Sequence, residues 1–150
     1  MNSIRRLIRI ALMASLAVAT AAQAADLTKQ EPVTVTLKLG TADGQHRFTP
    51  DSLTLEAGKL YKLRLENTGS QPYYFGSAGL ADMVYTRKVV ALDATGKVVA
   101  EVYGPIRRLE ISAGHTTEWW FLPVRTGVFD DVISTKKLAD GGMRATIEVK

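Results

Sequence analysis

Residues 33–39 read VTVTLKL, with an apolar side chain at every second position and Thr or Lys between them. This alternation is typical of a β-strand that buries one face and exposes the other. Similar short runs follow, and turns rich in Gly, Asp, Asn or Ser separate them. They cover residues 53–55, 60–66, 89–92, 97–100, 109–111, 117–122, 128–133 and 145–149. We predict an all-β fold of seven or eight strands, an antiparallel Greek-key β-sandwich or barrel.

Two stretches between these runs carry local signals. Residues 93–96 read DATG between two apolar runs, which predicts a hairpin with Gly96 at a positive φ. Residues 75–86 are less regular, so we expect a short helix or a loop there.

Residues 1–24 differ in composition from the rest of the chain. They contain three arginines and no acid, then an apolar run over residues 7–22, and they end in AQA. This pattern predicts a signal peptide that is cleaved before Ala25. The uncharged stretch after Arg9 is shorter than the roughly 20 residues that span a bilayer, so we expect no membrane span after cleavage.

The leader implies an exported protein. We predict one domain over residues 25–150 and a periplasmic location. Arg5-Arg6 leaves the twin-arginine route open beside the general secretory route, which we favour.

Charge and cysteine content exclude several functions. Without residues 1–24 the chain has 16 basic and 15 acidic residues, against a net charge of +4 for the whole sequence. A nearly neutral chain lacks the clustered basic face that nucleic-acid binding needs. The absence of cysteine excludes disulfides, iron–sulfur clusters and thiolate sites. We find no catalytic constellation, and therefore predict that the protein is not an enzyme.

Several short motifs, in a fixed order from about Val33 onward, resemble those of cupredoxins. The motifs are Phe48-Thr49-Pro50, Leu53-Thr54-Leu55, Ala57-Gly58, a strand ending at Asn67, Pro72 before Tyr73-Tyr74-Phe75, Tyr85-Thr86-Arg87-Lys88-Val89, Thr126-Gly127-Val128-Phe129, Gly142-Met143 and Thr146-Ile147-Glu148-Val149. The resemblance implies a cupredoxin-like sandwich similar to small exported bacterial proteins of the plastocyanin and azurin type.

Cupredoxins hold a type-1 copper through two imidazoles, one thiolate and a weak axial thioether. The resemblance places the first His at Tyr73, the Cys at Ile133, the second His at Leu138 and the axial Met at Met143. Aliphatic side chains cannot bind a metal, and a lone thioether binds Cu(II) feebly. We therefore expect no cofactor, and an apolar plug of Ile133 and Leu138 that contributes about 1.5–3 kcal/mol for each side chain.

Copper bound in another way is the alternative. His46 and His115 fall in predicted turns that lie towards the copper end of a cupredoxin, so with Met143 they would form a His/Met site suited to Cu(I). The opposing interpretation is that both histidines are solvated.

The aromatic residues favour core packing and protein contacts over a redox or metal-ligand role. Tyr73 and Tyr74 admit a redox or phenolate-ligand interpretation, but we favour one ring in the core and the other covering the sandwich edge. Trp119 and Trp120 face opposite sides of a strand, so one anchors the core and the other lies outside. Tyr74, Trp119 and Trp120 are the candidate partner surface.

Asp131 lies next to Asp130 on a predicted strand, and one of two neighbours on a strand faces inward. An inward carboxylate needs a partner. The candidates are Arg87, Lys88 and Arg125, and the sequence does not choose among them.

The function expected from the sequence is a non-enzymatic periplasmic binding or accessory module that lacks type-1 copper. It would bind an unidentified periplasmic protein through the former copper end. The alternative function is a periplasmic copper carrier or sensor that uses His46, His115 and Met143.

Overall fold

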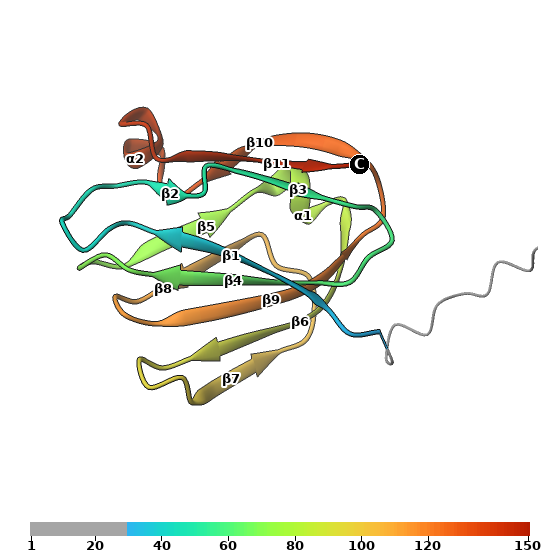
Figure 1. Ribbon diagram of the computed structural model, residues 1–150, viewed down its shortest axis with the longest axis horizontal. Coiled ribbons are helices and arrows are strands. Elements are labelled where there is room, and N and C mark those ends of the chain that lie inside the picture. Colours follow the sequence, from blue (N-terminus) through green and yellow to red (C-terminus); the bar gives the residue numbers. More distant parts are fainter. Residues whose placement is uncertain (1–29) are drawn as a thin grey trace, which may run out of the picture.

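Two β-sheets face each other in the computed structural model, which describes residues 30–150 (Figure 1). The signal peptide predicted for residues 1–24 lies outside the described residues. Sheet A has the strand order β2-β1-β4-β9-β6-β7, and sheet B has the order β3-β11-β10-β5-β8. The elements are β1 (Val33–Leu39), β2 (Phe48–Thr49), β3 (Ser52–Leu55), β4 (Tyr61–Asn67), β5 (Tyr73–Gly76), α1 (Ala78–Ala81), β6 (Val84–Leu92), β7 (Val98–Val102), β8 (Arg108–Ile111), β9 (Thr116–Pro123), β10 (Gly127–Ile133), α2 (Lys136–Asp140) and β11 (Arg144–Val149).

The predicted β-sandwich is confirmed, but its strand count and pairing differ from the prediction. Residues 30–150 form eleven strands rather than seven or eight. Two of them were missed: β2 has only two residues, and β5 reads YYFG, whose residue types do not alternate although their burial does. The pairs β1–β4 and β3–β11 are parallel. The chain crosses to sheet B for β3 before β4 returns beside β1, and this crossover gives β1 and β4 the same direction.

Apolar residues at alternate positions build the core between the sheets. Leu37 and Leu39 of β1 and Leu63 and Leu65 of β4 are at most 1% exposed. Trp119 of β9 is also 1% exposed and packs against neighbouring aromatic rings from both sheets. The ring centroids of Phe121 and Phe75 lie 4.4 and 6.1 Å from that of Trp119. Burial of each such side chain contributes about 1.5–3 kcal/mol.

A β-bulge in β10 changes which residues of that strand face the core. The register with β11 shifts between Phe129 and Val132. Both of these side chains are buried although they are three positions apart, which a regular strand does not allow. The inward-facing residues of β10 are therefore odd-numbered up to Phe129 and even-numbered from Val132 onward.

Helix α1 and the β6–β7 hairpin confirm the local signals, whereas α2 was not predicted. The irregular stretch contains α1, whose N-cap Ser77 accepts a hydrogen bond from the N–H of Leu80 at 3.1 Å. Thr135 caps α2 in the same way. Gly96 in the hairpin has φ +83°.

Asp131 has other partners than the cations that we predicted. Its carboxylate accepts hydrogen bonds from the Ser77 hydroxyl and, at 2.8 Å, from the N–H of Gly79. Lys88, one of the candidates, pairs with Glu101 at 2.8 Å. The neutral donors at the start of α1 thus stabilise the carboxylate and fasten this helix to β10.

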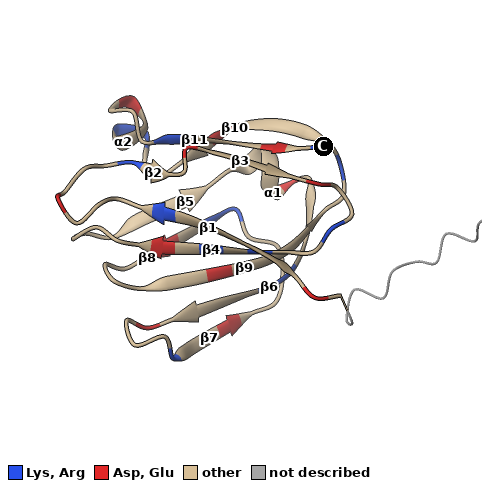
Figure 2. Ribbon diagram, viewed as in Figure 1, with Lys and Arg blue, Asp and Glu red and all other residues tan. Residues whose placement is uncertain are grey.

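Acidic and basic residues are interspersed over both sheets (Figure 2). Among the described residues, no helix has the length and apolar composition needed to cross a membrane.

Candidate functional site

Tyr73 starts β5 at the end of the sandwich where β1 and β4 end and which also carries α2, and its side chain is 1% exposed. Its ring fills a slot between two glycines. A Cβ at Gly69 would lie 2.6 Å from the ring, and a Cβ at Gly40 would be closer still. Gly40 also has φ +67°, a conformation that favours glycine. The slot therefore requires glycine at both positions.

Asn67, buried at the end of β4, shapes the loop that leads to Tyr73. Its side-chain amide donates to the carbonyls of Gln71 and Ile111, each at 2.8 Å, and its side-chain oxygen accepts from the N–H of Gly69 at 3.0 Å. These bonds satisfy a buried polar side chain and fix the direction of the loop.

The hydroxyl of Tyr73 lies 2.6 Å from Nδ1 of His46, and the two rings meet edge-on with centroids 5.8 Å apart. His46 belongs to the exposed loop between β1 and β2. Burial raises the pKa of Tyr73, and a hydrogen bond with Gln71 opposes that effect. The pair therefore joins a buried phenol to an imidazole that reaches solvent.

Ser134, which follows β10, is the buried residue beside Tyr73. It is 2% exposed, and its hydroxyl accepts a hydrogen bond from the N–H of Tyr74 at 2.9 Å. Ile133 is only partly buried and lies outside the core cluster. The predicted plug of Ile133 and Leu138 is therefore wrong, because the bulge turns Ile133 away from the core. The pair Asp130-Asp131 in the middle of the strand is the sequence signal of that irregularity.

Met143 and Leu138 are the two remaining positions that the resemblance carried over. Met143 is fully buried in the core, and Leu138 on α2 packs against the same core. Leu138 also lines a surface hollow of about 530 Å³ together with His46, Pro72 and Lys137.

A type-1 copper does not fit these residues. The positions that the resemblance gives to the strong ligands hold the phenol of Tyr73 and the aliphatic side chains of Ile133 and Leu138, and only the thioether of Met143 matches the usual donor set. The phenol contacts His46, and the buried hydroxyl of Ser134, next to Ile133, accepts a hydrogen bond from the backbone. Within residues 30–150, no three His, Cys, Asp or Glu side chains are placed to hold a metal ion.

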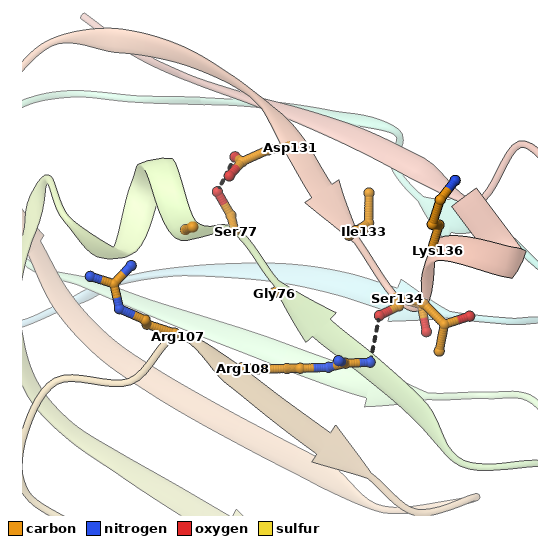
Figure 3. A pocket seen from close by; sticks show the side chains of 10 residues that line it. Gly76, Ser77, Arg107, Arg108, Asp131, Ile133, Ser134 and Lys136 are labelled. Atoms are coloured by element: carbon orange, nitrogen blue, oxygen red, sulfur yellow. Dashed lines mark hydrogen bonds between the residues drawn. The ribbon is translucent and has the colours of Figure 1, made fainter. Parts of the chain in front are cut away.

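A second hollow, of about 360 Å³, opens between β5 and β10 (Figure 3). Ile133 and Thr135 line it, and Thr135 also lines the first hollow. Arg108 extends across it, donating to the carbonyl of Ser134 at 3.1 Å while its guanidinium lies 4.1 Å from the ring centroid of Tyr74.

The two histidines have separate partners. His115 precedes β9, and its Nδ1 lies 2.9 Å from the carbonyl oxygen of Ala113. Hydrogen bonds from Thr95 and Lys97 lower the pKa of the Asp93 carboxyl in the β6–β7 hairpin, and nearby His115 makes the smallest contribution to that lowering. His46 contacts Tyr73 instead. The structure thus offers no support for a shared site of His46, His115 and Met143.

The three aromatic residues of the candidate partner surface do not lie together. Trp119 is the core member of its pair, and Trp120 lies on the outer face of sheet A, with Lys62 and Lys88 about 5 Å from its ring centroid. Tyr74 faces outward from sheet B, since both its neighbours in β5 are buried. Only Tyr74 therefore belongs to the end that carries the two hollows.

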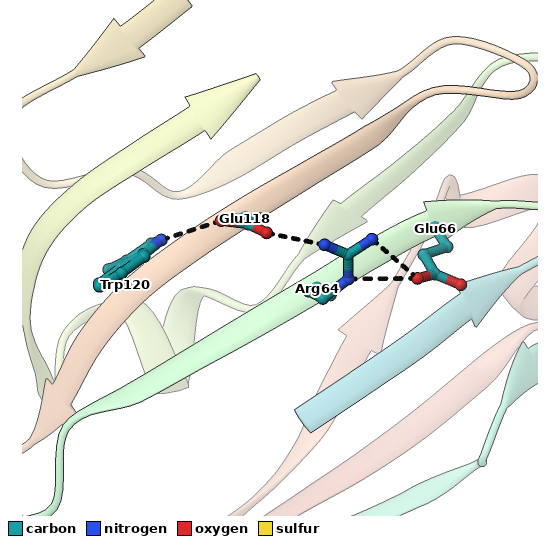
Figure 4. Close-up of polar contacts among 4 residues, drawn as sticks. All are labelled: Arg64, Glu66, Glu118 and Trp120. Carbon is teal, nitrogen blue, oxygen red and sulfur yellow. Dashed lines mark hydrogen bonds and ion pairs between the residues drawn. The ribbon is translucent and has the colours of Figure 1, made fainter. Parts of the chain in front are cut away.

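Trp120 is part of a polar network on the outer face of sheet A (Figure 4). Its indole N–H donates to Glu118 at 3.3 Å, and Glu118 pairs with Arg64 at 2.8 Å. Arg64 also pairs with Glu66 at 3.1 Å. The Arg64–Glu118 ion pair ties β4 to β9, and Trp120 contacts that pair through Glu118.

No protein-family model matches the chain, and no curated protein matches it. Solved structures do. A multicopper oxidase from Campylobacter jejuni superimposes with a TM-score of 0.66 and 14% identity, over 81% of this chain and 31% of the oxidase. A multicopper oxidase from Pediococcus acidilactici gives a TM-score of 0.58 and 12% identity, over 80% of this chain and 26% of the oxidase.

Auracyanin A, a blue copper protein from Chloroflexus aurantiacus, gives a TM-score of 0.50 and 16% identity, over 80% of this chain and all of auracyanin A. The chain spans only about a third of the length of the oxidases that it matches. At these identities the likeness concerns the architecture of the chain. The described part of the protein has a cupredoxin-like fold.

Proposed function

We propose that this protein is a non-enzymatic, periplasmic cupredoxin-like module that works without type-1 copper and binds a protein partner. The proposal rests on the side chains that lie at the former copper end. Tyr73, Ile133 and Leu138 stand at the positions that the resemblance gives to the strong ligands, and the buried residue after Ile133 is Ser134, whose hydroxyl accepts a hydrogen bond from the backbone. The similar structures include a multicopper oxidase and a blue copper protein, so this chain keeps their fold with a different set of side chains.

The surface over these residues supports the binding role. We call it the end surface and define it by Pro72, Tyr74, Ile133 and Leu138 with the two hollows beside them. Apolar side chains next to Arg108 and Lys137 provide the mixture of apolar contact and positioned donors that protein interfaces use.

Metal content is the first experiment. The mature protein, purified from a periplasm, is analysed for bound elements and then titrated with Cu(I) and Cu(II). We expect no stoichiometric metal and no tight binding. One tightly bound copper per chain would overturn the proposal, and loss of that copper in a His46→Ala, His115→Ala double variant would identify the carrier or sensor alternative instead.

The location of the partner site is tested by photo-crosslinking from two positions in the chain. A photo-crosslinking amino acid replaces Leu138 on the end surface or, as control, Val128 on β10, which is 67% exposed. We expect a discrete crosslinked periplasmic protein from position 138 only. Equal products from both positions would contradict the assignment of the end surface.

Signal cleavage is tested separately. The N-terminal sequence of the protein purified from the periplasm should begin at Ala25.

A further inference from the structure

We propose that Tyr73 and His46 form a proton-coupled redox pair, in which Tyr73 gives one electron to an outer-sphere oxidant and His46 takes the phenol proton. The oxidant is a high-potential one-electron acceptor, a metal complex or the metal centre of a docked protein. This inference goes beyond the proposed function and is testable on the isolated protein.

The 2.6 Å contact between the Tyr73 hydroxyl and His46 Nδ1 carries the proposal. With neutral His46 protonated at Nε2, the phenol O–H donates to Nδ1. Loss of one electron makes a phenol strongly acidic, and a base within hydrogen-bond reach takes the proton without diffusion. The step converts the phenol and neutral imidazole into a neutral phenoxyl radical and an imidazolium, while the oxidant is reduced by one electron.

The surroundings suit the products of this step. The ring of Tyr73 is held in the glycine slot and is 1% exposed, so the radical is shielded from solvent and from coupling with other radicals. His46 lies in an exposed loop, so water solvates the positive charge on the imidazolium. Pro72 and His46 line the hollow of about 530 Å³, which brings an oxidant close to Tyr73.

Tyr61 provides a matched contrast within the same chain. It is also buried, 4% exposed, and its hydroxyl oxygen accepts a hydrogen bond from the N–H of Glu56 at 2.8 Å. A backbone amide cannot accept the phenol proton. Both tyrosines are thus buried, but of the two only Tyr73 has a base next to its hydroxyl.

The experiment uses photogenerated tris(bipyridine)ruthenium(III) as the oxidant, with transient absorption and electron paramagnetic resonance to detect phenoxyl radicals. We expect Tyr73→Phe to reduce the long-lived radical about tenfold or more, and Tyr61→Phe to leave it unchanged. Short-lived signals from exposed aromatic residues should remain in both variants. An undiminished long-lived radical in Tyr73→Phe overturns the proposal.

The role of His46 is separated from a structural one by two variants. Glutamine in His46→Gln can accept the hydrogen bond but not the proton, whereas His46→Ala leaves room for added 4-methylimidazole. We expect both variants to lose the long-lived radical and the imidazole to restore it in His46→Ala alone. Wild-type radical yield in His46→Gln would contradict the pair. In the wild type itself, Tyr73 oxidation should be slower in D₂O, and equal rates would also contradict it.

Discussion

One position along β10 decides what stands at the former copper end. Strict alternation from Phe129 places Ile133 inward, and the bulge makes Ser134 the buried residue instead. The pair Asp130-Asp131 indicates an irregularity in the sequence, but a bulge depends on pairing with β11, which a single strand does not encode. Tyr73 and Met143, which lie outside the bulge, were located by the resemblance alone. The resemblance placed His46 and Tyr73 towards the same end, but their direct contact, between residues 27 positions apart, was not predicted.

The assignment of Ser134 predicts how a copper site can be rebuilt. The triple variant Tyr73→His, Ser134→Cys, Leu138→His adds two imidazoles and a thiolate around Met143. We expect Cu(II) binding with the intense visible absorption of a copper–thiolate bond. The control carries Ile133→Cys in place of Ser134→Cys and should lack this absorption. The same spectrum from both variants would show that Ser134 has no special position.

The glycine slot makes a second prediction at the scale of one residue. Gly69→Ala places a methyl group against the Tyr73 ring and should lower the free energy of unfolding by about 1–3 kcal/mol. Gly141→Ala is the control, because its Cβ would meet its nearest neighbour at 3.4 Å. Urea denaturation measures both. In a Tyr73→Leu background the effect of Gly69→Ala should shrink, and an undiminished loss would place the strain elsewhere.

At the scale of elements, alternation predicted the long strands well and the short ones poorly. In β1 and β4 apolar side chains recur at every second position, and the inward faces of these strands were evident. In β9 the neighbours Trp119 and Trp120 left the inward face open, and the burial of Trp119 settles it. In contrast, β2 and β5 depend on their neighbours for their conformation. The parallel pairing of β1 with β4 depends on a chain crossover between sheets, which residue patterns do not specify.

The ion pair of Arg64 and Glu118 joins two of these strands. Glu118 has only 11% of its side chain exposed, so Arg64→Met leaves a poorly solvated carboxylate and should lower the free energy of unfolding by about 1–2 kcal/mol. Adding Glu118→Met should recover part of that loss. Lys136→Met, which breaks an exposed pair, should change it by less than about 0.5 kcal/mol. Urea denaturation distinguishes these outcomes, and equal losses for Arg64→Met and Lys136→Met would contradict them.

The β6–β7 hairpin should depend on pH. Hydrogen bonds from Thr95 and Lys97 lower the pKa of Asp93 below 3.8. A carboxyl with a lowered pKa in the folded state stabilises the hairpin at neutral pH, and the effect is lost as pH falls through that pKa. The protection factors of the Thr95 and Lys97 amides, each taken relative to the intrinsic exchange rate at the same pH, should therefore fall at low pH. In Asp93→Ala these protection factors should be low already at pH 7, and pH-independent protection factors in the wild type would refute this.

At the scale of the molecule, sheet A has an exposed apolar edge strand. Sheet A ends in β7, all of whose residues are exposed, including Val98, Val99 and Val102. An apolar edge strand of this kind presents unpaired backbone groups to other chains.

We therefore expect Val99→Lys to slow aggregation during heating without changing the melting temperature. Val124→Lys alters an exposed valine in the loop between β9 and β10, outside any strand, and should leave aggregation unchanged. Light scattering and calorimetry make the comparison. Equal effects of the two substitutions would indicate a general effect of charge.

Sheet B has a seam. Its register joins β10 to β5 at Ile133 and Gly76, and beyond that pair the bonds of Ser134 with Tyr74 and Arg108 hold the strands together. Sheet B therefore consists of two groups of strands, β3-β11-β10 and β5-β8, which few hydrogen bonds connect. We expect a pulling force, or a ligand that enters the hollow crossed by Arg108, to separate these two groups before the six strands of sheet A separate.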